Sequence, residues 1–246
     1  MEKDFYLQYA AVEDQHWWFV GRRLIVDQVI RQLTLPKNAQ ILEVGCGTGG
    51  NLSMLARHGQ VSAMELDETA CLIANQRQVT KVYLGSLPER IPFSTEYDLI
   101  VILDVLEHLD DDLAALRKLH SQLKPGGWLL ITVPAYQFLW SHHDEINHHK
   151  RRYVLRDLKR VVSKAGFAVR HGSYFNSFLF PLVAGVRIFR KLFHIESNSA
   201  LSSDLKKPPL LVNQFLTILF ATERHLIGRF RLPFGVSILL LAQKKF

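Results

Sequence analysis

The 246-residue chain is poor in cysteine, with only two such residues, and it has no unbroken apolar run long enough to cross a bilayer. Two thiols cannot supply the disulfide framework of a small secreted domain, so we expect a reducing compartment. A membrane-spanning helix needs about 20 apolar residues, whereas the apolar runs at 177–186 and 209–222 have ten and fourteen. The composition therefore predicts no membrane-spanning helix.

The N-terminal residues lack the apolar core of a secretory signal, which predicts a cytoplasmic protein, at most peripheral to the inner face of the membrane. Lys and Arg outnumber Asp and Glu by 30 to 23, and residues 176–235 carry much of the excess, with eight basic residues against three acids. The basic residues in that range alternate with aliphatic side chains rather than with aromatic stacking platforms. We therefore expect no nucleic-acid partner.

Apolar runs alternate with helical patterns along most of the chain, and this rhythm predicts an α/β fold with a doubly wound, mostly parallel sheet. Runs such as 99–103 and 128–133 lack polar alternation, as expected for parallel strands covered by helices on both faces. Strands are expected at 39–44, 61–64, 81–84, 99–103, 128–133, 167–174 and 237–242. Helices are expected at 5–33, 51–57, 68–78, 110–123 and 155–165, with turn residues at 124–127.

Four parts are expected: an N-terminal helical cap (1–36), an α/β core (37–175), an apolar helical insertion (176–235) and the last strand of the core sheet (236–246). Apolar residues of the insertion recur at helical spacing, which predicts amphipathic helices, and the Ser- and Asn-rich stretch 197–203 is typical of a connector. Such helices could cover a hydrophobic acceptor, lie on an anionic membrane surface, or form a homodimer contact.

Glycines at 45, 47 and 49 directly follow the first predicted strand. Glycine has no Cβ, so these positions can take positive φ and let a ligand approach the main chain. The loop fits both the dinucleotide pattern G-x-G-x-x-G and the acid-x-G-x-G-x-G pattern of S-adenosylmethionine (SAM) enzymes. Glu43 favours SAM, because a carboxylate repels a pyrophosphate but can accept from the ammonium of a cationic cofactor. An NAD-dependent oxidoreductase is the alternative.

Further cofactor-binding residues are expected where the next strands end, because ligands of such sheets bind outside the carboxyl ends of the strands. Glu65 would accept hydrogen bonds from the ribose hydroxyls, with Leu66 beside it. Ser86 and Leu87 follow the third strand and would lie near the adenine, and Asp104 follows the fourth.

The segment around residues 16–23 is dense in aromatic and basic side chains. In one interpretation Trp18 packs on the core. In the other, the segment forms a flap over the cofactor, with Trp18 covering it and Arg22 near its carboxylate.

Five short segments together make the chain resemble the class I SAM-dependent methyltransferases over residues 39–175. They are Glu43-Val44-Gly45-Cys46-Gly47-Thr48-Gly49, Glu65, Asp104-Val105-Leu106-Glu107-His108, Leu123-Lys124-Pro125-Gly126-Gly127 and Ala165-Gly166-Phe167. The resemblance implies a seven-stranded sheet with an antiparallel last strand, SAM bound across the glycine loop including Cys46, and Glu65 on the ribose. Ser86 departs from the pattern, because many relatives have an aspartate near the adenine.

The spacing of Asp104, Glu107 and His108 is also similar to the metal-ligand triplet of the demethylubiquinone-type O-methyltransferases, which would imply Mg²⁺ and a catechol acceptor. Mg²⁺ prefers more oxygen ligands than this triplet offers. The histidines of 142–149 also lack the companion cysteines of a structural zinc site. The sequence therefore favours a site without metal.

Residues 140–153, after the fifth predicted strand, contain four histidines and would face the methyl donor. Methyl transfer needs alignment of donor and nucleophile, in some cases with removal of a proton, and histidine titrates near neutrality. We predict His149 as the base, His143 as the second candidate, and Asp144 as an orienting or binding acid. The loop could instead bind an anionic acceptor without proton transfer.

Together these features predict a methyltransferase that moves a methyl group from SAM to a small or lipid-like acceptor, at oxygen. A SAM-binding regulatory or scaffold protein without turnover is the alternative from a different class. The histidine-rich loop favours the enzyme, because a protein that only binds SAM has no need of proton-transfer groups beside the methyl donor.

Overall fold

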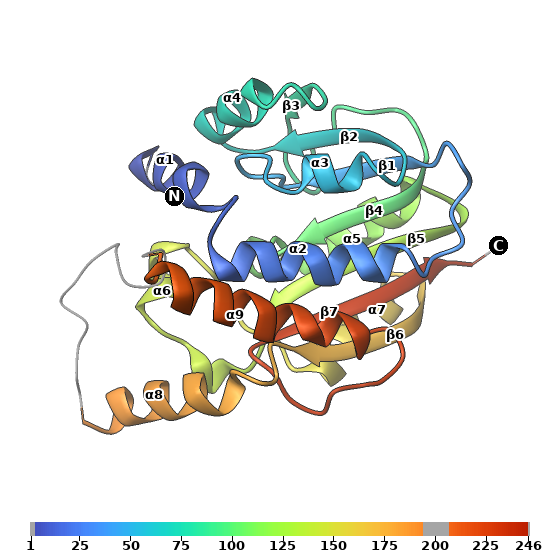
Figure 1. Cartoon of the computed structure of the whole chain (residues 1–246). Coiled ribbons are helices and arrows are strands. Elements are labelled where there is room, and N and C mark those ends of the chain that lie inside the picture. The colour runs from blue at the N-terminus through green and yellow to red at the C-terminus, as the bar shows by residue number, and fades with distance from the viewer. Residues whose placement is uncertain (1–2, 194–206, 246) are drawn as a thin grey trace.

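A seven-stranded sheet forms the centre of the molecule, in the order β3-β2-β1-β4-β5-β7-β6 (Figure 1). The computed structural model describes residues 3–193 and 207–245. Strands β1 to β5 pair in parallel, whereas β7 is antiparallel to both β5 and β6. The predicted doubly wound, mostly parallel sheet is confirmed.

The strands are almost entirely apolar. Alternate residues of a strand point to opposite faces of the sheet, and helices cover both faces, so side chains on both sides are buried. In β1 and β4, for example, Ile41 and Leu99 belong to one core cluster, while Leu42 and Ile100 belong to the other. The strand bounds are β1 Gln40–Val44, β2 Gln60–Glu65, β3 Val82–Leu84, β4 Tyr97–Leu103, β5 Leu123–Pro134, β6 Phe167–Phe175 and β7 Ser237–Lys244. All seven lie where the sequence predicted a strand.

Helices cover both faces of the sheet (Figure 1). Their bounds are α1 Lys3–Val12, α2 Trp17–Ile30, α3 Leu52–Leu55, α4 Glu68–Gln76, α5 Asp112–Ser121, α6 His142–Ile146, α7 Leu155–Lys164, α8 Phe180–Leu192 and α9 Leu210–Thr222. Short 3₁₀ turns are η1 Leu106–His108, η2 Gln137–Leu139 and η3 Glu223–His225. Gly166, at φ +102°, follows α7 as predicted.

Two local predictions are wrong. The single helix expected over 5–33 is broken into α1 and α2, because the His16 side chain accepts from the Trp18 amide (3.3 Å) and caps a new helix. The turn expected at 124–127 is part of β5. The strand absorbs these residues through a register shift opposite Tyr97, with Gly126 at φ +76°.

The insertion separates the antiparallel neighbours β6 and β7, as predicted, and its two helices differ in their packing. Helix α9 lies along α2, where Gly21 leaves room for Phe220: a Cβ on Gly21 would lie 2.3 Å from that ring. Helix α8 lies at the edge of the molecule, and Ala184 is its one buried residue (Figure 1). In the described ranges no helix is long and apolar enough to cross a membrane. The connector predicted at 197–203 lies outside the described residues.

Candidate active site

The glycine loop between β1 and α3 leaves part of its main chain open. Gly45 and Gly47 have φ values of +70° and +56°, a region that side chains disfavour. A Cβ on Gly45 would lie 2.6 Å from Cγ2 of Val105, so Gly45 serves close packing. A Cβ on Gly47 would meet nothing within 4 Å. Gly47 is therefore the point at which a ligand can approach the backbone. Cys46 lies between them, with its side chain buried in a small apolar cluster.

Two buried carboxylates flank this loop, as predicted. Glu43 accepts from Asn51 Nδ2 (2.9 Å) at one oxygen, while its Oε2 has no hydrogen-bond partner within the described chain. Burial raises the pKa of Glu43 to about 7, although Asn51 and Arg22 oppose the rise. An unpaired buried oxygen beside an open loop fits a ligand that carries an ammonium group.

Glu65 has a different environment. Its carboxylate accepts from the backbone amides of Gly47 (2.8 Å), Leu66 (2.8 Å) and Asp67 (3.1 Å). Burial raises the pKa of Glu65, and these amides oppose the rise. The carboxylate thus holds the loop in shape, and its remaining lone pairs suit the hydroxyl donors of a ribose.

A cavity of about 120 Å³ lies beyond Glu65, at the ends of β2 and β3. It is lined by Leu66, Glu68, Leu84, Gly85, Ser86 and Arg90. The structure thus brings Leu66 and Ser86 together on one cavity. Leu87, the next residue, is partly buried, and its side chain packs against the core. Arg90, which exchanges backbone hydrogen bonds with Ser86 (2.8 and 2.9 Å), was not predicted.

Trp18 and Arg22 extend from α2 in different directions. Trp18 stacks on Phe220, with ring centroids 5.1 Å apart, and also on Phe175, so its contacts are those of a core residue. Arg22 forms an ion pair with Asp104, whose other oxygen accepts from Thr132 Oγ1 (3.1 Å). Packing thus accounts for Trp18, whereas Arg22 lies at the site and meets the predicted residue Asp104.

The N-terminal segment contacts the glycine loop through a residue that the sequence did not single out. Glu13 is buried, accepts from Thr48 and Arg77, and would collide with a Cβ on Gly50. Tyr6 of α1 lies near the acids at the end of β2, since its pKa is raised first by burial and then by Glu65. Glu13 is one of several charged residues near the N-terminus and belongs to no recognisable motif. Its contact with the glycine loop could therefore be seen only in the structure.

Asp144 is the centre of the histidine-rich loop. Its carboxylate is fully buried and accepts from Arg152 Nε (2.7 Å) and Nη2 (3.0 Å), His149 Nδ1 (2.9 Å) and the Ser141 amide (2.8 Å). Burial alone would raise the pKa of Asp144, but the hydrogen bonds from His149 and Arg152 outweigh it and hold the pKa well below its usual range. An ionised Asp144 requires a proton on His149 Nδ1, and in the neutral form of the ring the lone pair is then on Nε2.

His143, the second base candidate, lies farther from this arrangement. Its ring centroid is 6.3 Å from that of His149, and its Nε2 is 3.2 Å from Asn147 Nδ2. Asp144 Oδ1 forms its hydrogen bond to an imidazole with His149 Nδ1, so Asp144 orients His149.

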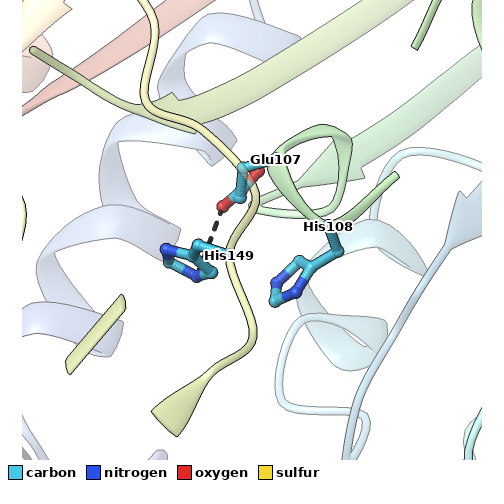
Figure 2. A group of neighbouring side chains, drawn as sticks. All are labelled: Glu107, His108 and His149. Atoms are coloured by element: carbon cyan, nitrogen blue, oxygen red, sulfur yellow. Dashed lines mark ion pairs between the residues drawn. The ribbon is translucent and has the colours of Figure 1, made fainter. Parts of the chain in front are cut away.

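Glu107, His108 and His149 converge although they come from two loops, one after β4 and one after β5 (Figure 2). One oxygen or nitrogen of each lies within 4.8 Å of the others, and Glu107 Oε1 is 4.0 Å from His149 Nε2. Glu107 is fully buried, and neither carboxylate oxygen has a hydrogen-bond partner in the described chain. This group has the donor types of a metal site.

The protonation of this group follows from its burial. Burial and the nearby Asp104 raise the pKa of Glu107 well above its usual range. Burial and His149 lower the pKa of His108 to about 4, so its imidazole is neutral at pH 7. Asp104 itself is occupied by Arg22 and Thr132. The three groups that converge are therefore not the Asp104, Glu107 and His108 triplet noted in the sequence.

Comparison with known proteins identifies the family. Residues 16–172 match the model of the family described as "Methyltransferase domain". A ubiquinone biosynthesis O-methyltransferase of Rickettsia felis is 28% identical over 136 residues, which cover 53% of this chain and 51% of that protein. A trans-aconitate 2-methyltransferase of Deinococcus radiodurans is 32% identical over 124 residues, which cover 48% and 45%. The chain thus spans about half the length of the curated relatives it matches.

Solved structures agree on the fold. A Haloferax volcanii putative methyltransferase, in complex with its Trm112 activator, matches with a TM-score of 0.63 at 14% identity, over 100% of both chains. A Bacillus halodurans putative methyltransferase gives a TM-score of 0.58 at 18% identity, over 89% of this chain and 97% of that one. At such identities the likeness shows the fold alone.

The family match decides between the two cofactors that the glycine pattern left open, in favour of SAM over NAD. The open main chain at Gly47 and the unpaired oxygen of Glu43 fit that choice, since both suit a nucleoside with a cationic tail. The chain belongs to the class I SAM-dependent methyltransferases.

Proposed function

We propose that this protein transfers a methyl group from SAM to an oxygen atom of a small, lipid-like acceptor. The observation that carries the proposal is the convergence of two sets of residues at the carboxyl ends of β1, β2, β4 and β5. The glycine loop with Glu43 and Glu65 would hold the donor. The loops with Asp104 and His149 lie at the same edge of the sheet, where an acceptor would meet it.

SAM would supply a methyl group on a positively charged sulfur. The acceptor oxygen attacks that carbon, the carbon–sulfur bond breaks with its electrons moving to sulfur, and the acceptor proton is released. The residues of the chain align the reactants: the amides of the glycine loop, Glu43 and Glu65 fix the donor, and Arg22 is held at the site by Asp104.

His149 is the residue that we propose for activating the acceptor. Asp144, in a buried ion pair with Arg152, contacts His149 Nδ1 and fixes the imidazole, so the neutral ring would have its lone pair on Nε2, 4.0 Å from Glu107. That lone pair can take a proton or bind a metal ion. Either role would assist loss of the acceptor proton, which methylation at oxygen requires.

Replacing His149 with alanine tests this role. We expect turnover to fall by about 10²-fold, the lower end of what a general acid–base group contributes, while the dissociation constant of SAM changes less than about twofold. Turnover is measured as the gain of one methylene mass in metabolite and lipid extracts incubated with the protein and methyl-labelled SAM. His142→Ala is the control, because His142 lies in the same loop, is half-exposed and pairs only with Glu145 among the contacts described.

Unchanged turnover in His149→Ala would remove the residue from the mechanism. SAM binding by the wild type without label transfer to any extract fraction would favour the alternative of a SAM-binding protein without turnover. The two results bear on different parts of the proposal, because the first concerns one side chain and the second concerns the reaction itself.

The lipid-like character of the acceptor is inferred from α8. This helix exposes large apolar side chains: Leu182, Val186, Ile188, Phe189 and Leu192. It is tied to the active-site loop by Arg187, which donates to the Leu139 carbonyl (2.5 Å) and lies 3.8 Å from Asp144 Oδ2. An apolar helix anchored beside the catalytic loop suits an acceptor drawn from a lipid phase.

The charge of the insertion favours an anionic membrane surface. Its described part contains seven basic residues, Arg187, Arg190, Lys191, Lys207, Arg224, Arg229 and Arg231, whereas its one described acid, Glu223, is buried. Helix α9 adds exposed apolar side chains at Leu210, Leu211, Phe215 and Ile218. Basic groups near a membrane contribute about 1 kcal/mol each through anionic lipid headgroups.

Changing Leu182 and Phe189 to serine should therefore weaken binding to vesicles. We expect the wild type to sediment with phosphatidylglycerol-containing vesicles and the double variant to lose most of this binding, because both side chains are more than half exposed and leave the core unchanged. Leu7→Ser and Leu72→Ser, similarly exposed in α1 and α4, are the controls. Equal sedimentation of all variants would favour a lid over the acceptor, and a change in mass by light scattering would indicate a homodimer contact.

A further inference from the structure

We propose that Glu107, His108 and His149 bind a divalent transition-metal ion such as Zn²⁺. The inference rests on the proposed function, because it concerns activation of the acceptor at the same site. Two imidazoles and one carboxylate form a donor set typical of zinc and similar metals. Mg²⁺ fits less well, because it requires oxygen ligands.

The burial of Glu107 is the observation that most favours a metal ion. A carboxylate that is wholly removed from water and unpaired costs free energy, so such groups are rare unless something compensates them. Glu107 is fully buried, and in the described chain neither of its oxygens finds a hydrogen-bond donor. His149 Nε2 lies 4.0 Å from Glu107 Oε1, too far for a hydrogen bond. A cation between these two atoms would satisfy both.

The histidines are oriented as metal ligands usually are. A ligating histidine commonly donates its second ring nitrogen to a carboxylate or a backbone carbonyl, which fixes the ring. His149 donates from Nδ1 to Asp144 (2.9 Å), and Arg152 in turn holds Asp144. The His108 and His149 rings lie 4.7 Å apart at 85°, and each can direct a nitrogen towards Glu107 (Figure 2).

The spacing of the donor atoms is compatible with binding after a small closure. Bonds of about 2.0–2.1 Å at tetrahedral angles place donor atoms roughly 3.3 Å apart. The observed separations, up to 4.8 Å, would have to contract by up to about 1.5 Å. Rotation of three side chains on two loops can provide this. Three protein ligands leave further coordination positions, so the ion would lower the pKa of an acceptor hydroxyl that reaches it.

Asp104 is not a ligand in the proposed site, in contrast to the triplet of Asp104, Glu107 and His108 noted in the sequence. Arg22 and Thr132 occupy its two oxygens, so it supplies negative charge near the ion without a free ligand atom. The third ligand is instead His149, which lies 41 positions after His108 in the chain. When His149 holds an ion it cannot also accept a proton, so the two roles exclude one another.

The test measures metal binding directly. The purified protein is freed of metal with a chelator and dialysed against Zn²⁺, Co²⁺ or Mg²⁺. Metal content, thermal unfolding and, with Co²⁺, visible absorption are then measured. We expect one equivalent of Zn²⁺ or Co²⁺, a rise in Tm with Zn²⁺, and Co²⁺ bands typical of four or five nitrogen and oxygen ligands. Mg²⁺ should give no comparable rise in Tm.

Glu107→Gln is the informative variant. It keeps the shape of the side chain but cannot ionise, so the metal-free variant should unfold at the same or a higher temperature than the metal-free wild type. It should also lose the bound equivalent and the Zn²⁺-dependent rise in Tm, as should His108→Ala. Glu145→Gln, on the exposed side of the same loop, is the matched control and should keep both.

Equal metal content in the wild type and Glu107→Gln would overturn the proposal, as would no binding by the wild type up to millimolar Zn²⁺. A lower Tm of metal-free Glu107→Gln, with unchanged metal uptake, would show Glu107 to be structural. None of these readings depends on methyl transfer. SAM binding measured on the same samples therefore shows separately whether the proposed function fails.

Discussion

Replacement of Gly47 by valine is expected to raise the dissociation constant of SAM by about 10³-fold or more, equivalent to about 4 kcal/mol of binding free energy. Gly47 has φ +56°, and its Cβ direction leads into open space, with nothing within 4 Å. The new side chain would therefore meet no protein atom but would occupy the space where the cofactor approaches the backbone. Calorimetric titration with SAM and S-adenosylhomocysteine measures the effect.

The control for Gly47→Val is Gly185→Val. Gly185 also has nothing within 4 Å of an added Cβ, but it lies in α8 with ordinary helical dihedrals. We expect its SAM affinity to match the wild type. The Gly47 variant should lose about 1–2 kcal/mol of stability from the left-handed backbone alone, so circular dichroism must show that it is folded. A folded Gly47→Val protein with normal SAM affinity would contradict the assignment of the loop.

Replacement of Asp144 by asparagine should cost both activity and stability. The carboxylate is fully buried and pairs with Arg152, whose side chain is 4% exposed, so the change leaves an uncompensated guanidinium inside the protein. Breaking such a pair costs about 3–5 kcal/mol. Turnover should fall by up to about 10²-fold, the loss expected for His149→Ala, because His149 loses the charged acceptor that fixes its ring. Denaturant unfolding and the labelled-SAM assay measure the two effects.

Asp157→Asn is the matched control for Asp144→Asn. Asp157 pairs with Arg160 on the surface of α7, with both side chains 52% exposed, so its loss should cost less than about 1 kcal/mol and leave turnover unchanged. A stability loss at Asp144 no larger than at Asp157 would show that the buried pair is not needed. If Asp144→Asn lowered turnover without loss of stability, Asp144 would serve only to orient His149.

Much of the fold follows from short-range features of the sequence. Unbroken apolar strands, the glycine loop after β1 and the stop at Gly166 are set by main-chain dihedrals and by the period of apolar residues, which involve neighbours in the chain. Acids at the ends of β1 and β2 could be assigned to one ligand because parallel strands end at a common edge. The helix break at His16 was missed, since one side-chain cap decided it.

Contacts between loops depend instead on which strands are neighbours in the sheet, and only the tertiary structure decides that. The pairing of β4 with β5 brings Glu107 to His149, and the packing of α9 on α2 turns Trp18 into the core. Glu13 reaches the glycine loop for the same reason. The sequence by itself determined the sheet and the donor loop, because both are built from local backbone preferences. The fold decided that Glu107 meets His149 and that Arg22 meets Asp104, because the two residues of each pair lie tens of positions apart in the chain.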